Sequence, residues 1–345
     1  MYASYVPSQL TDPLWGRLSQ ARLFITGGTG LFGHWLLDSL SDVNQRLNLN
    51  IEATVLTRNP DLAKTRMPHL DNRINFVMGN VENFVMPMEK FDVILHMANT
   101  SAEETFLGSS QIQKLQLLFK GTQKVIELAK TSGASRILFT SSGAVYGNQL
   151  CEHIQETTLT RLDPMKADSG LALGKSVAEF LLAQASTELS SEVVIARCFT
   201  FVGPGIPMNL HYAIGNFIKN ASEGKPIIIK GDGSDIRSYM YMGDLVWWLL
   251  KILLDGKSGE VYNVGSDQPI SIFDLAHKVA EISILKSQVI VQGQSSYSVG
   301  LPVRKIYVPS IDKASSNLGL HITTDISTGI SDTLKNLEIK LIKNN

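Results

Sequence analysis

The 345-residue sequence has few cysteines, no excess of either charge and no histidine pairs at metal-binding spacing. Its two cysteines, Cys151 and Cys198, form no CxxC motif, which argues against a disulfide framework or a cysteine metal site. The seven histidines form no HxxxH or HExxH pair, so a metal site of that kind is unsupported. With 31 basic and 32 acidic residues, the chain has no overall field to attract nucleic acid or an anionic membrane.

Long apolar runs are also lacking. The longest covers residues 245–254 and is interrupted by Lys251, whereas a membrane span needs about 20 apolar residues. The first twenty residues have no basic start followed by an apolar run, so they do not resemble a secretory signal. We therefore expect a cytoplasmic protein with no membrane or nucleic-acid partner.

Short strand-like runs rich in Val, Ile and Leu alternate with helical patterns through the first half of the chain. The runs lie at residues 22–28, 51–58, 74–80, 91–98, 135–142 and 191–199, and helices are expected from about residue 31, at 111–130 and at 171–187. This alternation predicts an α/β fold with a Rossmann-type, doubly wound parallel sheet. We expect an N-terminal arm (1–21), a dinucleotide-binding domain (22–200) and a smaller α/β substrate lobe (201–340) interleaved with it.

A glycine-rich turn follows the first predicted strand. In "ITGGTGLFG", Gly27, Gly30 and Gly33 have GxxGxxG spacing, with Leu31 and Phe32 between the last two. Such glycines let backbone N–H groups approach a pyrophosphate at a helix N-terminus. The motif in this strand–turn–helix context predicts that these five residues bind a dinucleotide.

The residues after the next strands bear on the identity of that dinucleotide. The second strand ends with Thr57 and Arg58 and lacks the acidic residue that would contact the ribose hydroxyls of NAD. Arg58 could pair with a 2′-phosphate, so NADP is mildly favoured over NAD. Further cofactor contacts are expected after the third and fourth strands, from Asn80, Val81, Met97 and Ala98.

Motifs along nearly the whole chain resemble one family. "TGGTGLFG", "DVILHMA", "FTSSGAVYG", "GKSVAEFLL", "ARCFTFVGPG", "KGDGSDIRSYMYMGDL" and "GEVYNVGS" occur in the order found in extended short-chain dehydrogenases of the NAD-dependent epimerase/dehydratase family. The resemblance implies an N-terminal lobe that binds NAD or NADP and a C-terminal lobe that binds a nucleotide-diphosphate (NDP) sugar. It also implies a homodimer formed through a helix bundle.

The resemblance also implies a catalytic set, from which one member is missing. Ser142 matches the family's hydroxyl residue and Lys175 its lysine, but Leu171 stands where the family has a tyrosine. A positioned acid or base is typically worth about 10²- to 10⁴-fold in rate, so the usual oxidation should be slow unless another group substitutes. Tyr146 and Lys175 are the candidates, Lys175 because burial lowers a lysine pKa.

The substrate side is also assigned by resemblance. Arg237 and Arg304 match positions that contact the nucleotide diphosphate, where a guanidinium can grip phosphate oxygens in pairs. Asn209 and Asn216 are expected to line the pocket.

Two further residue assignments concern mechanism. Asp244 is interpreted as a helix N-cap. Gly143 replaces the first of the two acids of family 4,6-dehydratases, which argues against that chemistry. The leading hypothesis is an enzyme acting on an NDP-hexose with an altered acid/base; the alternative is a catalytically silent dinucleotide or nucleotide-sugar binding protein.

Overall fold

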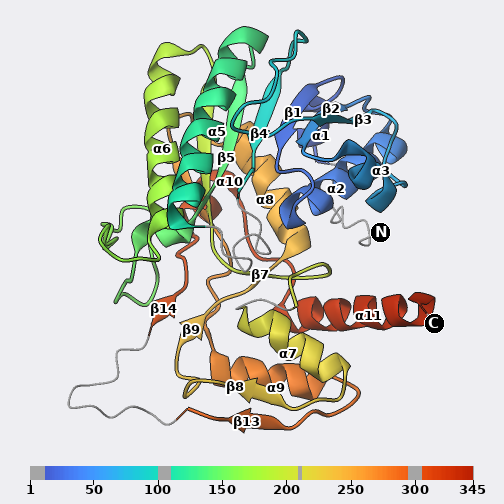
Figure 1. Ribbon diagram of the computed structural model, residues 1–345, viewed down its shortest axis with the longest axis vertical. Coiled ribbons are helices and arrows are strands. Elements are labelled where there is room, and N and C mark those ends of the chain that lie inside the picture. The colour runs from blue at the N-terminus through green and yellow to red at the C-terminus, as the bar shows by residue number, and fades with distance from the viewer. Residues whose placement is uncertain (1–11, 100–109, 209–211, 294–304, 345) are drawn as a thin grey trace.

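The computed structural model describes residues 12–99, 110–208, 212–293 and 305–344, and it has an upper and a lower lobe (Figure 1). The upper lobe is built on seven strands: β1 (Arg22–Thr26), β2 (Glu52–Thr57), β3 (Ile74–Met78), β4 (Val93–His96), β5 (Arg136–Ser142), β6 (Glu192–Cys198) and β11 (Val261–Val264). Their order is β3-β2-β1-β4-β5-β6-β11, and every neighbouring pair is parallel. The predicted doubly wound α/β sheet is therefore confirmed.

Helices cover both faces of this sheet. α2 (Leu31–Leu47) and α8 (Met242–Asp255) lie on one face, and α5 (Gln111–Ser132) and α6 (Gly170–Glu188) lie side by side on the other (Figure 1). Sequence signals set the limits of α5. Ser110 begins it with a capping box completed by Gln113, and Gly133 ends it in the left-handed conformation with φ +74°.

Alternating burial along the strands builds two cores. In β1, Leu23 and Ile25 pack with the side chains of α2 and α8, whereas Phe24 packs in the core beneath α5 and α6. This is the two-residue period of a strand whose two faces are both covered. The sheet edge that carries the carboxyl ends of the strands is thereby fixed between two rigid layers.

The lower lobe joins helices α7 (Ala213–Ser222), α9 (Ile272–Ile282) and α11 (Ile326–Asn344) to the paired strands β8 (Ile227–Ile229) and β13 (Val289–Val291). A small sheet, β12-β9-β14, uses Ile270–Ser271, Ile236–Arg237 and Ile306–Tyr307. Another pair joins β7 (Phe201–Val202) to β10 (Met240–Tyr241). Between these parts the chain returns to the upper lobe as α8 and β11, and later as α10 (Asp312–Leu318).

The N-terminal arm is anchored where it is described. Helix α1 (Leu14–Arg17) buries Leu14 and Trp15, and the Trp15 ring lies 6.0 Å from that of Trp247 in α8. Arg17 also forms an ion pair with Asp255. None of the helices within the described residues has the length and apolar character needed to span a bilayer.

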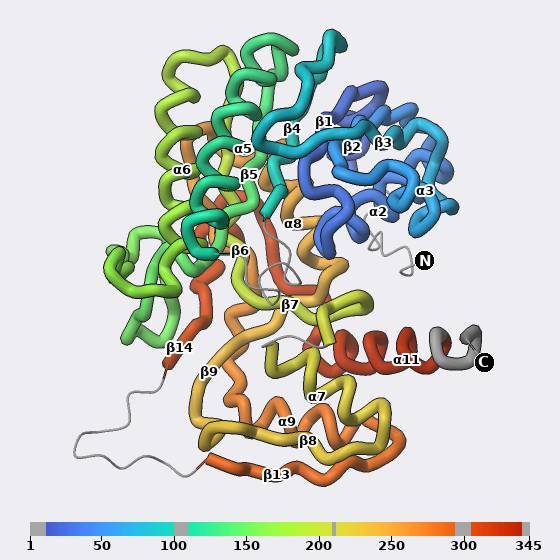
Figure 2. The backbone as a smooth tube through the Cα atoms, in the orientation of Figure 1, coloured from blue at the N-terminus to red at the C-terminus, as the bar shows by residue number. Residues whose placement is uncertain are grey.

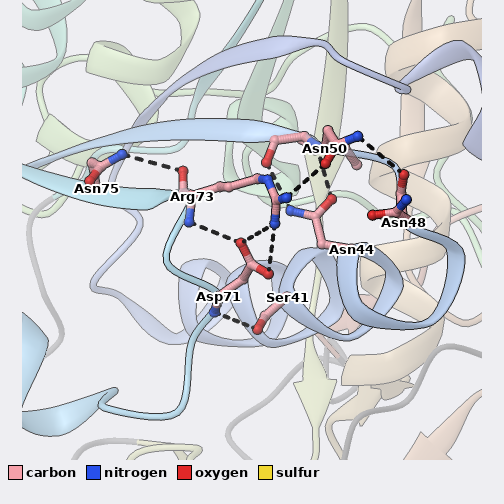
Figure 3. Close-up of polar contacts among 8 residues, drawn as sticks. Ser41, Asn44, Asn48, Asn50, Asp71, Arg73 and Asn75 are labelled. Carbon is pink, nitrogen blue, oxygen red and sulfur yellow. Dashed lines mark hydrogen bonds and ion pairs between the residues drawn. The ribbon is translucent and has the colours of Figure 1, made fainter.

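A polar cluster holds the ends of the strands remote from the glycine turn (Figure 3). The Asn44 side chain both donates to the Ile51 carbonyl and accepts from its N–H, at 2.8 and 2.9 Å. Arg73 donates to Asn50 Oδ1 at 2.7 Å and pairs with Asp71. These contacts tie the end of α2 to the starts of β2 and β3, and α3 (Pro60–Arg66) connects those two strands.

Candidate functional site

The glycine turn between β1 and α2 is crowded by backbone. Gly27 has φ +75°, and a Cβ there would lie 2.5 Å from the Met97 carbonyl. A Cβ on Gly33 would lie 2.3 Å from backbone atoms of Gly28, whereas Gly30 has only the Gly27 oxygen within 4 Å of its own Cβ position, at 3.3 Å. Gly27 and Gly33 are thus required by packing, because a side chain in either place would clash with the backbone that shapes the turn, called the glycine cradle below.

The start of α2 fits a phosphate-binding role. Gly30 is the N-cap in an extended conformation, and no side chain caps the helix there. The first-turn N–H groups therefore remain available for a ligand, and the helix dipole favours an anion at this end. Leu31 packs against the cores of both lobes, and the Phe32 ring meets that of Phe201 edge-on at 5.0 Å.

The ends of β2 and β3 lie beside this turn. Thr57 is buried and its hydroxyl accepts the Asn59 N–H at 3.3 Å, while Arg58 is exposed at the end of the strand. The Asn80 side chain accepts from the Glu82 N–H at 3.2 Å. Val81 is buried and lies against the Cβ position of Gly121 on α5, at 3.1 Å.

Beyond β4, Met97 and Ala98 pass close to the glycine turn. The Met97 N–H donates to the Thr26 carbonyl at 3.1 Å and the Ala98 N–H to the Thr26 hydroxyl at 3.2 Å. His96 is buried between Thr26 and Thr122, at 2.8 and 3.1 Å from their hydroxyls. Burial and, to a smaller extent, the nearby Lys175 charge lower the pKa of His96 to about 3, so the ring is a neutral structural group.

Lys175 points from α6 into the ends of the central strands. It is 2% exposed, its Nζ donates to the Thr140 carbonyl at 2.6 Å, and Nζ lies 4.6 Å from the centre of the Phe139 ring. Burial lowers its pKa to about 8, although Cys198 and Glu179 act in the opposite direction. Leu171 lies one helical turn earlier on the same face of α6 and is half-buried.

Ser142 ends β5 beside Cys198, the last residue of β6. Its hydroxyl accepts the Ala144 N–H at 3.1 Å and so caps the short helix η1 (Gly143–Tyr146). The hydroxyl of Tyr307, which comes from β14, lies close by, 2.5 Å from the Cβ position of Gly143, and the Ser142 side chain lowers the pKa of that phenol. Ser142 and Lys175, which the family resemblance assigned to one catalytic set, thus lie at one edge of the sheet, Ser142 at the end of β5 and Lys175 on α6 with its Nζ at the Thr140 carbonyl.

Tyr146 occupies the core beneath this edge. It is 1% exposed, and its hydroxyl donates to Asn263 Oδ1 at 2.8 Å. Burial raises its pKa to about 12, although Arg197, 4.7 Å over its ring, opposes the shift. The hypothesis that Tyr146 replaces the missing base is disfavoured, because its hydroxyl is bound and its pKa lies far above neutral.

Three residues that the sequence analysis did not single out support the site from below. Glu179 follows Lys175 by one turn of α6 and accepts two hydrogen bonds from Arg197, at 3.0 and 2.7 Å, and one from Ser141. Asn263 of β11 receives the Tyr146 hydroxyl and donates to the Ile154 carbonyl. The buried ion pair and these hydrogen bonds lock β5, β6 and α6 together.

On the substrate side, Arg237 lies in β9, about a quarter exposed, with Nη1 donating to the Ile236 and Lys305 carbonyls at 2.8 Å each. Asn216 lies in the first turn of α7. The predicted contacts Asn209 and Arg304 lie outside the described residues.

The N-cap interpretation of Asp244 is wrong. α8 begins at Met242, and the Asp244 carboxylate is buried, where it accepts the N–H groups of Thr323 and Thr324. Asp244 therefore fastens the segment before α11 to α8. It takes no part in capping the helix in which it lies.

The arrangement offers a phosphate cradle, a buried lysine and a serine hydroxyl along one edge of a parallel sheet. In open α/β sheets ligands bind at the carboxyl ends of the strands, where the strand order reverses, here between β1 and β4. A cation and a hydroxyl at such an edge can orient a ligand and move a proton at an oxygen atom. Among the described residues no group of three His, Cys, Asp or Glu side chains is placed to hold a metal ion.

The profile of the NAD-dependent epimerase/dehydratase family matches residues 23–265. The sequence is 27% identical over 312 residues to UDP-glucuronic acid decarboxylase 6 of Arabidopsis thaliana, covering 90% of this chain and 87% of that protein. The fold is similar to UDP-glucuronic acid 4-epimerase from Bacillus cereus in complex with NAD, with TM-score 0.76, 22% identity, and 94% and 98% of the chains covered. It is also similar to RMD from Pseudomonas aeruginosa complexed with NADPH, with TM-score 0.69, 21% identity, and 93% and 99% covered.

Proposed function

The chain belongs to the NAD-dependent epimerase/dehydratase family, and on that premise we propose that it is an enzyme that modifies a nucleotide-activated hexose with a nicotinamide dinucleotide. The observation that carries the proposal is the shared sheet edge, where the glycine cradle, Lys175 and Ser142 lie at the carboxyl ends of β1, β4 and β5. We assign residues 22–200 to the dinucleotide and 201–340 to the sugar nucleotide, with β11 and α8 returning to the first part.

The cofactor contacts follow from the cradle. Gly27, Gly30 and Gly33 with the first turn of α2 would hold the pyrophosphate, and Leu31 and Phe32 would cover it. The residues at the ends of the next strands would contact the adenosine and the nicotinamide side, namely Thr57, Arg58, Asn80, Val81, Met97 and Ala98. When bound, the nicotinamide supplies hydride transfer, which no amino-acid side chain provides.

We propose a preference for NADP. β2 ends at the buried Thr57 and the exposed Arg58, with no carboxylate between them to repel a 2′-phosphate. Relatives with bound cofactor include both an NAD and an NADPH complex, so the family fold accommodates either. Arg58 is the residue whose charge would decide between them.

The sugar nucleotide would bind across the junction of the lobes. Arg237 presents a guanidinium that is already oriented by two carbonyls, and Asn209, Asn216 and Arg304 would complete the pocket. Two similar proteins, a decarboxylase and a 4-epimerase, act by their names on UDP-glucuronic acid. We therefore propose a UDP-sugar as the first substrate to test.

The roles of the chain's own groups follow from their surroundings. Ser142 would hydrogen-bond the sugar oxygen at the reacting carbon. Lys175, whose pKa is lowered to about 8, would hold the cofactor ribose and could accept a proton, because part of its population is neutral near that pH. Leu171 supplies no proton-transfer group, so this site differs from the tyrosine-containing pattern that the sequence resembles.

Leu171 also favours a second candidate function. A protein that only binds its ligands would keep the glycine turn and the Arg237 guanidinium. It would need neither a catalytic tyrosine nor a lysine with a lowered pKa. Such a protein would be stabilised by its ligands and would form no product.

A homodimer is a further proposal. α5 and α6 lie side by side on the outer face of the sheet and expose Ile112 and Phe180, at 69% and 62% of their surface. A second copy could cover these side chains by forming a helix bundle. Sedimentation of the protein and of a Phe180→Glu variant tests this, and equal sedimentation of both as monomers would contradict it. The expectation of a cytoplasmic location stays a prediction.

Ligand-dependent thermal stabilisation tests the proposal as a whole. The protein should be stabilised by NADP or NAD and, separately, by a UDP-sugar, by an amount that grows as RT ln(1 + [L]/Kd). Arg237→Ala should remove the UDP-sugar effect and keep the cofactor effect, and Gly33→Ala should do the reverse if it folds. A protein that responds to neither class of ligand would contradict the proposed function.

A further inference from the structure

A tyrosine from the C-terminal lobe lies near Ser142, whereas α6 has Leu171 at the position where the family has its tyrosine. Tyr307 is the last residue of β14, and its hydroxyl lies beside the backbone of Gly143, close enough to the neighbouring Ser142 side chain for that side chain to favour the ionised phenol. Its ring lies 4.7 Å from that of Phe199, which follows β6 directly. Figure 2 shows β14 at the junction between the lobes, below the start of α6.

Gly143 makes room for this hydroxyl. A Cβ at position 143 would lie 2.5 Å from Tyr307 Oη and 2.9 Å from two atoms of the Phe199 ring. The backbone at Gly143 does not have a positive φ, so its conformation does not require glycine. The residue is needed for the space that Tyr307 fills, and the two positions therefore fit each other across two lobes.

Tyr307 also lies next to Arg237, the residue proposed to bind the diphosphate of the sugar nucleotide. It pairs with Arg237 in the parallel register of β9 and β14, and the Arg237 charge lies close enough to influence the phenol electrostatically. Arg237 donates to the carbonyl of Lys305, two residues before Tyr307. The paired strands β9 and β14 thus position both the Arg237 guanidinium and the Tyr307 hydroxyl.

We propose that Tyr307 is a catalytic residue that replaces the phenol missing at Leu171, and that its hydroxyl and that of Ser142 together bind the sugar oxygen at the reacting carbon. The inference rests on the proposed function, which it deepens by naming the group that contacts the substrate. Two hydroxyls that meet at one edge can each bind a third oxygen placed between them, as a carbonyl or alcohol oxygen of a sugar would be.

The surroundings of Tyr307 determine the protonation state of its hydroxyl. Burial raises the pKa of Tyr307 well above the ordinary value of tyrosine. The Ser142 side chain and the charge of Arg237 oppose the shift, and Cys198 and Tyr146 reinforce it. Tyr307 is therefore a neutral donor at physiological pH and not a tyrosinate. It stabilises negative charge on the sugar oxygen, and Lys175 remains the group able to accept a proton.

Carbon-13 NMR of protein labelled at tyrosine Cζ tests the contact without turnover. The chain has nine tyrosines, and Tyr307→Phe identifies one resonance by its loss. Ser142→Ala should shift that resonance, and Ser142→Thr, which keeps a hydroxyl, should restore it. If neither substitution changes the chemical shift of the Tyr307 Cζ resonance, the inference is overturned.

The same spectra separate this inference from the proposed function. UDP-glucose and UDP-glucuronic acid, added in turn, should shift the Tyr307 resonance. If a UDP-sugar shifts other tyrosines and leaves Tyr307 unmoved, the inference fails and the proposed function stands. If neither UDP-sugar changes any resonance and no UDP-sugar stabilises the protein, the proposed function fails and the inference fails with it.

Turnover gives the second readout. Tyr307→Phe should lower kcat by about 10²-fold or more and leave the KM for the sugar nucleotide nearly unchanged, because the lost hydrogen bond strengthens as charge develops on the oxygen. Tyr262→Phe is the control, since it removes the hydroxyl of a buried tyrosine away from Ser142, one that accepts the Lys257 N–H. A Tyr307→Phe enzyme with the kcat of the control would refute the assignment.

Discussion

Replacing Lys175 with methionine should stabilise the ligand-free protein and reduce its turnover. Burial lowers the pKa of Lys175 from 10.5 to about 8, against the opposing influence of Cys198 and Glu179. A shift of that size corresponds to about 3 kcal/mol, at about 1.4 kcal/mol per pH unit. At pH 7 the folded protein carries this penalty, because it holds a buried ammonium that the unfolded chain exposes to water.

The expected rise in the free energy of unfolding of Lys175→Met is smaller than the cost of burying the Lys175 ammonium. Methionine loses the 2.6 Å hydrogen bond to the Thr140 carbonyl and the cation–π contact with Phe139, each worth about 1 kcal/mol. The free energy of unfolding at pH 7 should therefore rise by about 1 to 2 kcal/mol. As the pH rises from about 8 to 10.5, folded Lys175 loses its proton before the unfolded chain does, so the wild-type protein recovers the penalty and the advantage of methionine disappears.

Urea unfolding of both ligand-free proteins at pH 7 and near pH 10.5 measures this difference, and groups unaffected by the substitution cancel between them. Lys120→Met, at an exposed position of α5, is the control and should change stability by less than about 0.5 kcal/mol. The reasoning is refuted if Lys175→Met is less stable than wild type at pH 7, or if the difference is the same at both pH values.

Four further substitutions follow from the site. Leu171→Tyr should raise turnover with any accepted sugar nucleotide, measured as kcat, because it adds an acid/base one turn from Lys175; an inactive but folded variant would argue against the site assignment. Arg58→Ala should weaken NADPH more than NADH by about tenfold or more in Kd, and equal weakening would count against a 2′-phosphate contact. Gly33→Ala should cost about 1 to 3 kcal/mol in urea unfolding, since its Cβ would meet Gly28 at 2.3 Å, and unchanged stability would contradict that clash. Gly143→Ala should move Tyr307, seen as a shift of its Cζ resonance, whereas an unshifted resonance would show that the space is not shared.

The sequence predicted the sheet and the cradle because both have local signals. Strands buried on both faces are continuous apolar runs, and a turn that must approach another backbone needs glycine at fixed spacing, as Gly27 and Gly33 do. These features are encoded within stretches of about ten residues. Ser142 and Lys175 were assigned by the resemblance to the family and not by this local pattern.

The groups around Ser142 were not predicted, because they come from distant segments. Tyr307 lies 165 positions from Ser142 and on a strand of two residues, which has no periodicity to recognise. Glu179 and Arg197 are 18 residues apart and meet only because α6 packs on β6. Its position near a helix start makes Asp244 look like a cap in the sequence, but its partners Thr323 and Thr324 follow some eighty residues later.

Mass spectrometry of sugar nucleotides tests the central claim most directly. The protein is incubated with UDP-glucuronic acid and a panel of other UDP-, dTDP-, GDP- and CDP-sugars, with NADP or NAD, in deuterated water, and each mixture is separated before its mass is measured so that isomers are resolved. The account predicts that one sugar nucleotide changes in mass, gains deuterium or is converted into a separable isomer, and that Lys175→Met reduces the conversion. A panel in which every sugar nucleotide is recovered unchanged, by a protein that those ligands nevertheless stabilise, would contradict an enzyme and indicate a binding protein.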